Sequence, residues 1–380
     1  MPAIHERFTA RVRALSSDGD GIVEHGGGQV FFVPGVWPGE QGEFRITGFK
    51  KRFGFAVLEQ LLEPSPERVV APCVHHGLGR GQCGGCPWQF VAYQAQLAAK
   101  ESRVRQALAR LADGERIAPI WSSPRTLGFR NRAQLKSDGR ALGFVSAGSR
   151  QLAPVDDCLV LTDTNRATLR ALAASLPNPA FRPSRGQDWT TLDIDEDIDA
   201  GQVALNRRRP FRQGNSEQNQ RMRQWLAAKL DRVDKSVPVL ELFAGSGNFT
   251  EVIAAAGFAR TLAVEGSGDA LAQLAAQALP GVDTLACNLF VGDAVDGVRR
   301  RMPQAGVLVL DPPREGFREV ARLLPKKHCL REVFYISCDL ATFARDLQVF
   351  VAAGFEVIEV QPLDQFPHTP HVELLCHLSR

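Results

Sequence analysis

The sequence contains no apolar run of eighteen residues, the length that a membrane-spanning helix requires. Its first ten residues, MPAIHERFTA, lack the basic segment and apolar stretch of a secretory signal. Internal repeats and low-complexity segments are absent as well. From these absences we expect a soluble, cytoplasmic protein with no membrane partner. The 380 residues, 44% of them apolar, suffice for two or three domains.

A strong net charge is also lacking, because the formal charge is only +3, and this balance predicts no particular partner. The basic residues are nevertheless clustered. Residues 71–150 carry twelve Lys and Arg but only four Asp and Glu, and NRRRPFR (206–212) contains four arginines and no acid. Such clusters suit a phosphate backbone and predict an RNA partner, although a solvated basic face is the alternative.

Disulfides are not expected for the eight cysteines, because the cytoplasm is reducing. Three cysteines cluster in CVHHGLGRGQCGGCPW and a fourth follows in DDCLVL: Cys73, Cys83, Cys86 and Cys158. Four thiolates suit either an iron–sulfur cluster or tetrahedral zinc. In a zinc site His75 or His76 could replace one sulfur, so the spacing leaves both metals open.

The first half of the chain has the pattern of short strands separated by Gly-, Pro- and Asp-rich turns. Four such runs within residues 7–62 predict a small barrel of the oligonucleotide-binding type. A linker (62–73) and a helix over about 90–112 follow. From 119 to 211 short strands return, with a hairpin formed by LGFRNRAQLKS and RALGFVSAG and one helix over about 163–175.

From about residue 216 strand-like runs alternate with helical stretches. The runs are 238–243, 261–266, 289–293, 307–313 and 332–338. This alternation predicts a parallel sheet with helices on both faces, and hence an α/β, Rossmann-like fold.

Two motifs in this region predict a nucleoside-containing cofactor. In LELFAGSGNFT (240–250) a strand leads into a turn with Gly245 and Gly247, where missing side chains let a ligand approach the backbone. Glu265, about 20 residues on, is placed to accept hydrogen bonds from ribose hydroxyls, and Asp293 ends the next expected strand. In VLVLDPPREG, Asp311 followed by two prolines is typical of nucleic-acid methyltransferases, which favours S-adenosylmethionine over NAD.

The last two motifs provide a nucleophile and a base. Cys338 in FYISCDLATF follows a strand and precedes a helix, whose N-terminus is expected to lower the pKa of the thiol. Glu373 lies between apolar neighbours in HVELLCHL, and such a carboxyl group tends to have a raised pKa that suits a general base.

Together, FRQGN, ELFAGSGNFT, DPPR, YISCDLATFARD and FPHTPHVE resemble the motifs of RNA 5-methyluridine (uracil-C5) methyltransferases, which use S-adenosylmethionine. The likeness covers nearly the whole chain. It implies three parts: an RNA-binding, OB-like TRAM barrel at 1–66; a mostly β central domain, with an iron–sulfur cluster and an RNA-binding role, at 67–90 and 118–212; and a class I methyltransferase domain at 91–117 and 213–380.

The resemblance also assigns roles to single residues. It makes Cys338 the nucleophile and Glu373 the general base. It implies a 4Fe-4S cluster on the four clustered cysteines. The cofactor contacts that it implies, with Gly245 of the glycine turn beside them, are Gln213, Phe243, Asn248, Glu265, Asp293 (with Asn288 nearby) and Asp311.

The predicted function is methyl transfer to carbon 5 of a specific uridine in structured RNA through a covalent cysteine–uracil intermediate, because addition of a thiolate makes that carbon nucleophilic. Ribosomal 23S RNA and transfer RNA are both candidates, and the TRAM barrel favours ribosomal RNA. We expect a monomer. The alternatives are an amino-group RNA methyltransferase, which needs no thiol, and a non-catalytic RNA-binding factor.

Overall fold

The computed structural model describes residues 2–207 and 209–380, so Arg208 of the predicted basic cluster lies outside the described residues. The chain divides into two compact units. The first contains the chain up to Ala99 together with Arg125–Arg207 and Pro367–Pro370, and the remainder forms the second. None of the helices in the described ranges combines the length and the apolarity needed to cross a bilayer.

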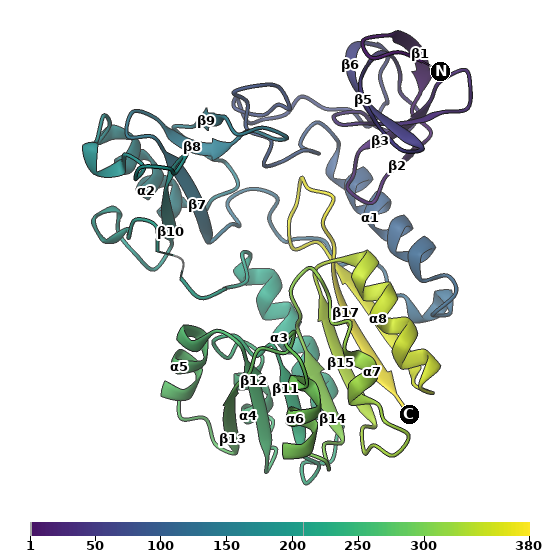
Figure 1. Cartoon of the computed structure of the whole chain (residues 1–380), viewed down its shortest axis with the longest axis vertical. Helices are drawn as coiled ribbons and strands as arrows, with labels where there is room; N and C mark the ends of the chain where they lie inside the picture. The colour runs from purple at the N-terminus through teal and green to yellow at the C-terminus, as the bar shows by residue number, and fades with distance from the viewer. Residues whose placement is uncertain (1, 208) are drawn as a thin grey trace. The chain divides into compact units, whose positions relative to one another are not determined.

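The first unit begins with a six-stranded sheet in the order β1-β5-β6-β4-β3-β2 (Figure 1). Its strands are β1 (Arg7–Arg11), β2 (Ala14–Leu15), β3 (Gly21–Glu24), β4 (Val30–Val33), β5 (Gln41–Lys50) and β6 (Phe53–Glu63). Alternate side chains point inward, as the period of a strand requires, and pack around Phe31 and Phe44, which are 0% and 1% exposed. The four predicted runs are strands, and β3 was not predicted.

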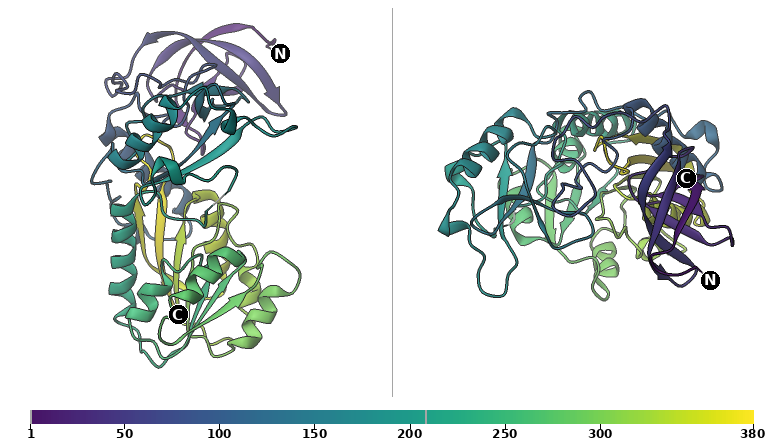
Figure 2. Two further views of the ribbon diagram at one scale, coloured as in Figure 1. Left: turned by 90° about the vertical axis from the view of Figure 1, so that its left-hand side faces the viewer. Right: turned by 90° about the horizontal axis from the view of Figure 1, so that it is seen from above.

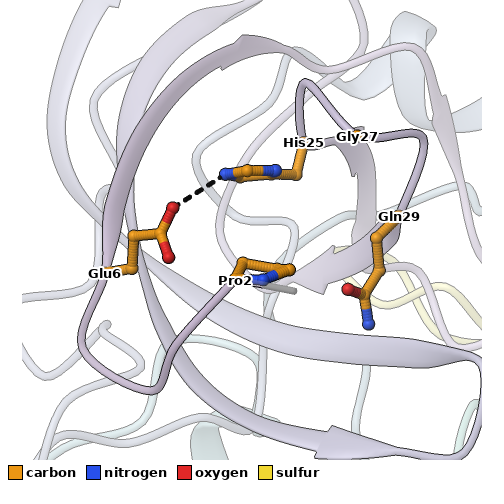
Figure 3. Close-up of a pocket in the computed structure, with 5 residues that line it drawn as sticks. All are labelled: Pro2, Glu6, His25, Gly27 and Gln29. Atoms are coloured by element: carbon orange, nitrogen blue, oxygen red, sulfur yellow. Dashed lines mark hydrogen bonds and ion pairs between the residues drawn. The ribbon is translucent and has the colours of Figure 1, made fainter.

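One polar contact links β1 to the turn that follows β3. Nε2 of His25 lies 3.1 Å from Oε1 of Glu6, beside a surface hollow of about 470 Å³ (Figure 3). The His25 ring also meets Phe8 of β1 edge-on, with 5.1 Å between ring centroids. Because β1 lies at one end of the strand order, these contacts join it to β3, from which the order otherwise separates it.

The same unit contains a four-stranded antiparallel sheet in the order β10-β7-β8-β9. Its strands are β7 (Arg132–Ser137), β8 (Leu142–Val145), β9 (Leu152–Pro154) and β10 (Thr190–Asp195). The β7–β8 hairpin and helix α2 (Asp163–Ala174) agree with the sequence prediction. The short 3₁₀ turns Pro179–Phe181 and Ala200–Gln202 also belong to the first unit, whereas the turn Gly114–Arg116 belongs to the second. Helix α1 (Tyr93–Leu108) has residues in both units.

The second unit contains a seven-stranded sheet in the order β13-β12-β11-β14-β15-β17-β16 (Figure 1). Its strands are β11 (Val239–Leu242), β12 (Thr261–Glu265), β13 (Val282–Ala286), β14 (Val307–Leu310), β15 (Glu332–Ser337), β16 (Glu356–Leu363) and β17 (Glu373–Ser379). The first five strands of this order pair in parallel, whereas β17 is antiparallel to both of its neighbours.

Helices cover both faces of this sheet (Figures 1 and 2). They are α3 (Ser216–Leu230), α4 (Thr250–Ala255), α5 (Gly268–Ala276), α6 (Ala294–Arg301), α7 (Val320–Leu323) and α8 (Leu340–Ala352). Strand residues alternate between two apolar cores: Val307 and Val309 pack with α3 and α4, while Leu308 and Leu310 pack with α6, α7 and α8. The predicted α/β architecture is therefore confirmed.

The prediction of a strand at 289–293 is wrong. β13 runs over Val282–Ala286, and Phe290 and Val291 are instead 52% and 62% exposed in the connection that follows. β13 is an edge strand whose residues are all at least partly exposed, so the apolar signal of a buried strand is missing there. Asp293 consequently lies at the start of α6 rather than at the end of a strand.

Candidate active site

Cys338 and Glu373 face each other at one end of an antiparallel strand pair. In the register of β15 and β17, Ser337 lies opposite Leu374. Continuing that register by one position places Cys338 opposite Glu373, and directly opposed residues of antiparallel strands have Cβ atoms about 5 Å apart. Cys338 is partly exposed and Glu373 is 3% exposed. The two groups that the motifs predicted to be catalytic are thus brought together by strand pairing.

The Cys338 thiol does not have the lowered pKa that we expected. Burial, followed by the charges of Glu373 and Asp311, raises the pKa of Cys338 from 9.0 to about 12. The N-terminus of α8 gives little compensation because it already has a carboxylate cap, in which Asp339 accepts a hydrogen bond from the Thr342 N–H at 2.9 Å. Without ligands Cys338, the predicted nucleophile, is therefore a neutral thiol near pH 7.

Glu373 has the raised pKa that its apolar neighbours predicted. Burial is the main cause, the Asp311 charge raises the pKa further, and Arg314 opposes both. Arg314 also lies 3.4 Å from Nε2 of His371, measured from its Nη2 atom. Burial and then Arg314 lower the pKa of His371 to about 4, so this ring is neutral near pH 7. The raised pKa makes the ionised Glu373 carboxylate a stronger proton acceptor than an ordinary glutamate, as a general base requires.

A chain of side-chain amides leads from the segment after β16 to Asp311, which directly follows β14. Nε2 of Gln365 donates to Oε1 of Gln213 at 3.1 Å, and Nε2 of Gln213 approaches Oδ2 of Asp311 at 3.5 Å. An ionised carboxylate only accepts hydrogen bonds, so Asp311 determines which end of the Gln213 amide it faces. Gln213 was predicted as a site residue, whereas Gln365, 1% exposed, was not.

Helix α8 holds the loop after Asp311 through contacts that sequence reasoning missed. Asp346, 1% exposed, accepts hydrogen bonds from the Phe317 N–H at 2.6 Å and the Tyr335 hydroxyl at 2.8 Å. The Thr342 hydroxyl donates to the Arg314 carbonyl oxygen at 3.0 Å. The sequence did contain a pattern that could have identified Asp346, because this acid lies on the apolar face of an amphipathic helix.

The glycine turn after β11 has the conformation that close approach of a ligand requires. Gly245 and Gly247 both have positive φ, and a Cβ on Gly247 would come within 2.8 Å of the Leu274 side chain. The Gly245 N–H donates to Oε2 of Glu265 at 2.9 Å, which connects the turn to the end of β12. Phe243 also has positive φ, and its ring centroid lies 5.2 Å from that of Phe317.

The other two predicted cofactor contacts have protein partners. Asn248 and Asn219 of α3 exchange two amide hydrogen bonds of 2.9 Å, so Asn248 joins the glycine turn to that helix. Asp293 forms an ion pair of 2.7 Å with Arg322 and is 83% exposed. Asn288, the second residue after β13 at the carboxyl edge, lies instead against Gly266, the residue after Glu265.

Acidic groups surround this sheet edge, and two more of them, besides Glu373, have strongly raised pKa values. Burial, with smaller contributions from Asp311 and Glu265, raises the pKa of Glu241 from 4.5 to about 8. Burial likewise raises the pKa of Asp311 from 3.8 to about 7. A site that gathers carboxyl groups in this way favours a cationic ligand, because the cation stabilises their ionised forms.

Replacing Glu241 by Gln is expected to stabilise the ligand-free protein more at pH 8 than at pH 5. The folded protein holds the Glu241 proton more tightly than the unfolded chain does. The contribution of Glu241 to the free energy of unfolding is therefore greatest below pH 4.5 and is lost as the pH rises toward 8. Gln cannot ionise, and the gain at pH 8 should be on the order of a few kcal/mol. Urea unfolding of wild type and E241Q at pH 5, 6.5 and 8 measures this gain. Asp283→Asn, at an exposed position of β13, is the control. A difference in unfolding free energy between wild type and E241Q that does not change with pH would contradict the raised pKa of Glu241.

The four clustered cysteines lie near one another in the first unit, and none is in a disulfide. Burial and then the charges of the other cysteines raise the pKa of Cys86 to about 12 and of Cys158 to about 11, which indicates a shared neighbourhood. Oδ1 of Asp156 lies 2.7 Å from Nε2 of His75 and engages that ring. Across the described ranges, no three His, Cys, Asp or Glu side chains are already arranged to hold a metal.

Comparison with known proteins agrees with this geometry. A model of the family described as tRNA (Uracil-5-)-methyltransferase matches residues 294–380. An RNA methyltransferase of Nitrosomonas europaea is 40% identical over 375 residues, which is 97% of this chain and 95% of that protein. The 23S rRNA (uracil(1939)-C(5))-methyltransferase RlmD of Halomonas elongata is 32% identical, with 97% and 88% covered.

Among solved structures, the tRNA (uracil-54, C5)-methyltransferase of Pyrococcus abyssi, bound to S-adenosyl-L-homocysteine, matches 98% of this chain and 100% of its own length with a TM-score of 0.69. At 21% identity this match concerns the fold. Fold and site together define a class I methyltransferase that uses S-adenosylmethionine. The chain belongs to the RNA uracil-C5 methyltransferase family and is an RNA (uracil-5-)-methyltransferase.

Proposed function

We propose that this enzyme methylates carbon 5 of a specific uridine in 23S ribosomal RNA through a covalent bond between Cys338 and the uracil ring. The observation that carries the proposal is the register that sets Cys338 opposite Glu373, with Asp311 close enough to raise the pKa of both. The choice of 23S RNA rests on the 32% identical relative named for that substrate, over nearly the full length of both chains.

The residues divide the reaction between them. Cys338 first loses its thiol proton to water, because its raised pKa keeps it neutral at rest. The thiolate then forms a bond to carbon 6 of uracil, and the electron pair of the 5,6 double bond moves onto the ring as an enolate. S-adenosylmethionine, when bound, would supply the methyl group for carbon 5, and its sulfur would keep the electron pair of the broken bond as a neutral thioether. Glu373 then removes the carbon 5 proton, and the returning electron pair restores the double bond and expels the Cys338 thiolate. The target uridine has to leave its stack to reach these groups.

The cofactor lies, in this proposal, along the carboxyl edge of β11, β12 and β14. Glu265 would accept hydrogen bonds from the ribose hydroxyls of the cofactor. Gly245 would contact the cofactor through its backbone and Phe243 through its ring. Gln213 and Asp311 would face the end of the cofactor that carries the methyl group. Asn248 supports the turn from behind. We place Asn288 rather than Asp293 beside the adenine, because Asn288 lies two residues after β13 and against Gly266, whereas Asp293 is paired with Arg322.

The experiment that tests this function uses labelled S-adenosylmethionine with unmodified 23S RNA and, separately, unmodified transfer RNA. Digestion and nucleoside analysis should give labelled 5-methyluridine from 23S RNA. Label in 5-methyluridine from transfer RNA alone would overturn the substrate, and label on an amino group would overturn the reaction. Sedimentation of the free enzyme tests the expected monomer.

Further parts of the chain have proposed roles in binding. The barrel (1–66) and the central segments (67–90 and 118–212) hold the RNA, and the segments 91–117 and 213–380 carry the chemistry.

We further propose that Cys73, Cys83, Cys86 and Cys158 hold a 4Fe-4S cluster. Their donor chemistry fits, because four free thiols share one neighbourhood. Burial raises the pKa of Cys83 and Cys86, and the positive charge of Arg130 opposes that rise. The cluster would brace this part of the RNA-binding surface.

Anaerobically purified protein is expected to be brown, with an absorbance shoulder near ~400 nm and about four irons per chain. Cys86→Ser should lose most of the iron, whereas Cys329→Ser, which changes an exposed cysteine outside the cluster, should keep it. Metal analysis and the absorbance spectrum measure both. A colourless protein with one zinc per chain would contradict the iron–sulfur assignment and favour tetrahedral zinc.

A further inference from the structure

Three phenylalanines form an apolar surface on the outside of the N-terminal barrel: Phe32 of β4 and Phe53 and Phe55 of β6. We name them the phenylalanine face. β4 and β6 pair in parallel, with Phe32 opposite Phe55. The ring centroids lie 5.1 Å apart for Phe32 and Phe53 and 5.6 Å apart for Phe53 and Phe55. By contrast Phe31, one residue before Phe32, points inward and is 0% exposed.

The neighbouring strand leaves this face open. In the register of β5 and β6, Gly48 lies opposite Phe55 and Lys50 lies opposite Phe53. A Cβ placed on Gly48 would meet nothing within 4 Å, so no side chain covers Phe55 from that direction. Phe55 is accordingly 40% exposed. By comparison, Trp88 and Phe129, two aromatic side chains of the basic region 71–150, are only 2% and 3% exposed.

A positively charged turn borders the phenylalanine face. Lys50, Lys51 and Arg52 connect β5 to β6, directly before Phe53, and all three are exposed. No hydrogen bond or ion pair of their side chains occurs among the interactions described for residues 2–207 and 209–380. The acid closest in register, Glu24 opposite Val30 of β4, is itself paired with Arg13 at 2.7 Å. The charge beside the rings is therefore uncompensated.

We propose that the phenylalanine face and the basic turn form a binding site for an unpaired segment of RNA, whose bases stack on the rings and whose phosphates pair with the three cations. Stacking accepts any base because every base has a π-face, and adjacent cations follow the backbone. Duplex RNA cannot use the rings, since its bases are already stacked on one another. This site rests on the proposed RNA-binding role of the barrel and specifies the form of RNA that the barrel takes.

The test uses full-length protein without S-adenosylmethionine and a 12-nucleotide RNA of adenosine and cytidine only. Because that RNA contains no uridine, its binding is independent of whether the enzyme methylates uridine in any RNA. Fluorescence anisotropy should give single-strand affinities about 5- to 30-fold weaker for Phe55→Ala, as the loss of one stacking contact predicts. Phe55→Trp should retain the affinity, and Leu62→Ala, which removes a 45% exposed apolar side chain far along β6, should leave it unchanged.

Salt dependence separates the two halves of the site. Replacing Lys50, Lys51 and Arg52 by Ala should reduce the slope of log affinity against log salt by about 2, at about 0.7 per phosphate contact. Phe55→Ala should weaken binding without changing that slope. The same RNA annealed to its complement should be insensitive to Phe55→Ala. Two results would overturn the proposal: an equal loss of affinity for single-stranded and duplex RNA in Phe55→Ala, or an affinity of Phe55→Ala as unchanged as that of Leu62→Ala. Either result would favour a protein as the partner of the phenylalanine face.

Discussion

Cys338→Ala is expected to lower the formation of 5-methyluridine by on the order of 10⁴-fold or more, because carbon 5 of uracil then has no nucleophile to activate it. The same variant should still bind S-adenosylmethionine, since Cys338 bonds to the uracil and not to the cofactor in the proposed mechanism. Nucleoside analysis of the RNA and equilibrium binding of the cofactor measure the two effects separately.

RNA with 5-fluorouridine at the target position extends this test. The wild type should form a stable covalent adduct, because fluorine cannot leave as the carbon 5 proton does, and Cys338→Ala should form none. Since the pKa of Cys338 is raised to about 12, adduct formation should accelerate as the pH rises from 6 to 9. Cys329→Ala, at an exposed cysteine, is the matched control. Methylation that survives Cys338→Ala, on an amino group of the RNA, would favour the chemistry that needs no thiol.

Glu373→Gln is expected to trap the enzyme on ordinary RNA in the presence of S-adenosylmethionine. Without a base the carbon 5 proton stays, so the methylated ring cannot expel Cys338, and turnover should fall by about 10²- to 10⁴-fold. Addition itself should persist, because removing the Glu373 charge removes one cause of the raised Cys338 pKa. A denaturing gel should show a protein–RNA band that the wild type does not accumulate.

The control for this variant is Glu356→Gln at the exposed start of β16, which should turn over normally without an accumulated band. A double variant, Glu373→Gln with Cys338→Ala, should lose the band, which ties the adduct to the thiol. Slow turnover of Glu373→Gln without any adduct would contradict the role of Glu373 in elimination and assign it to an earlier step.

The sequence predicted those parts of the site that lie within one motif. The glycine turn, Glu265 at the end of β12 and Asp311 at the end of β14 were all placed correctly, because each directly follows a buried apolar strand. The strand expected at 289–293 failed for the opposite reason. Its exposed Phe290 and Val291 resemble a strand, whereas the real edge strand β13 is polar and open to solvent.

Residues that act through contacts between distant segments were not predictable. Gln365 meets Gln213 far away in the chain, and only packing in the second unit brings the two amides within 3.1 Å. Asp346 is a visible anomaly on the apolar face of α8, yet its partners Phe317 and Tyr335 come from two other segments. The local sequence pattern shows that Asp346 is unusual, but it does not show which residues form hydrogen bonds with it.

The sequence by itself determined the α/β alternation and the cofactor class and predicted a nucleophile and a base, because strand and helix periods and turn chemistry are properties of neighbouring residues. Tertiary structure decided that β17 enters the sheet antiparallel to β15, which sets Cys338 opposite Glu373. It also decided that the thiol pKa is raised rather than lowered. A pKa depends on burial and charge summed over every nearby segment, and those neighbours exist only in the folded chain.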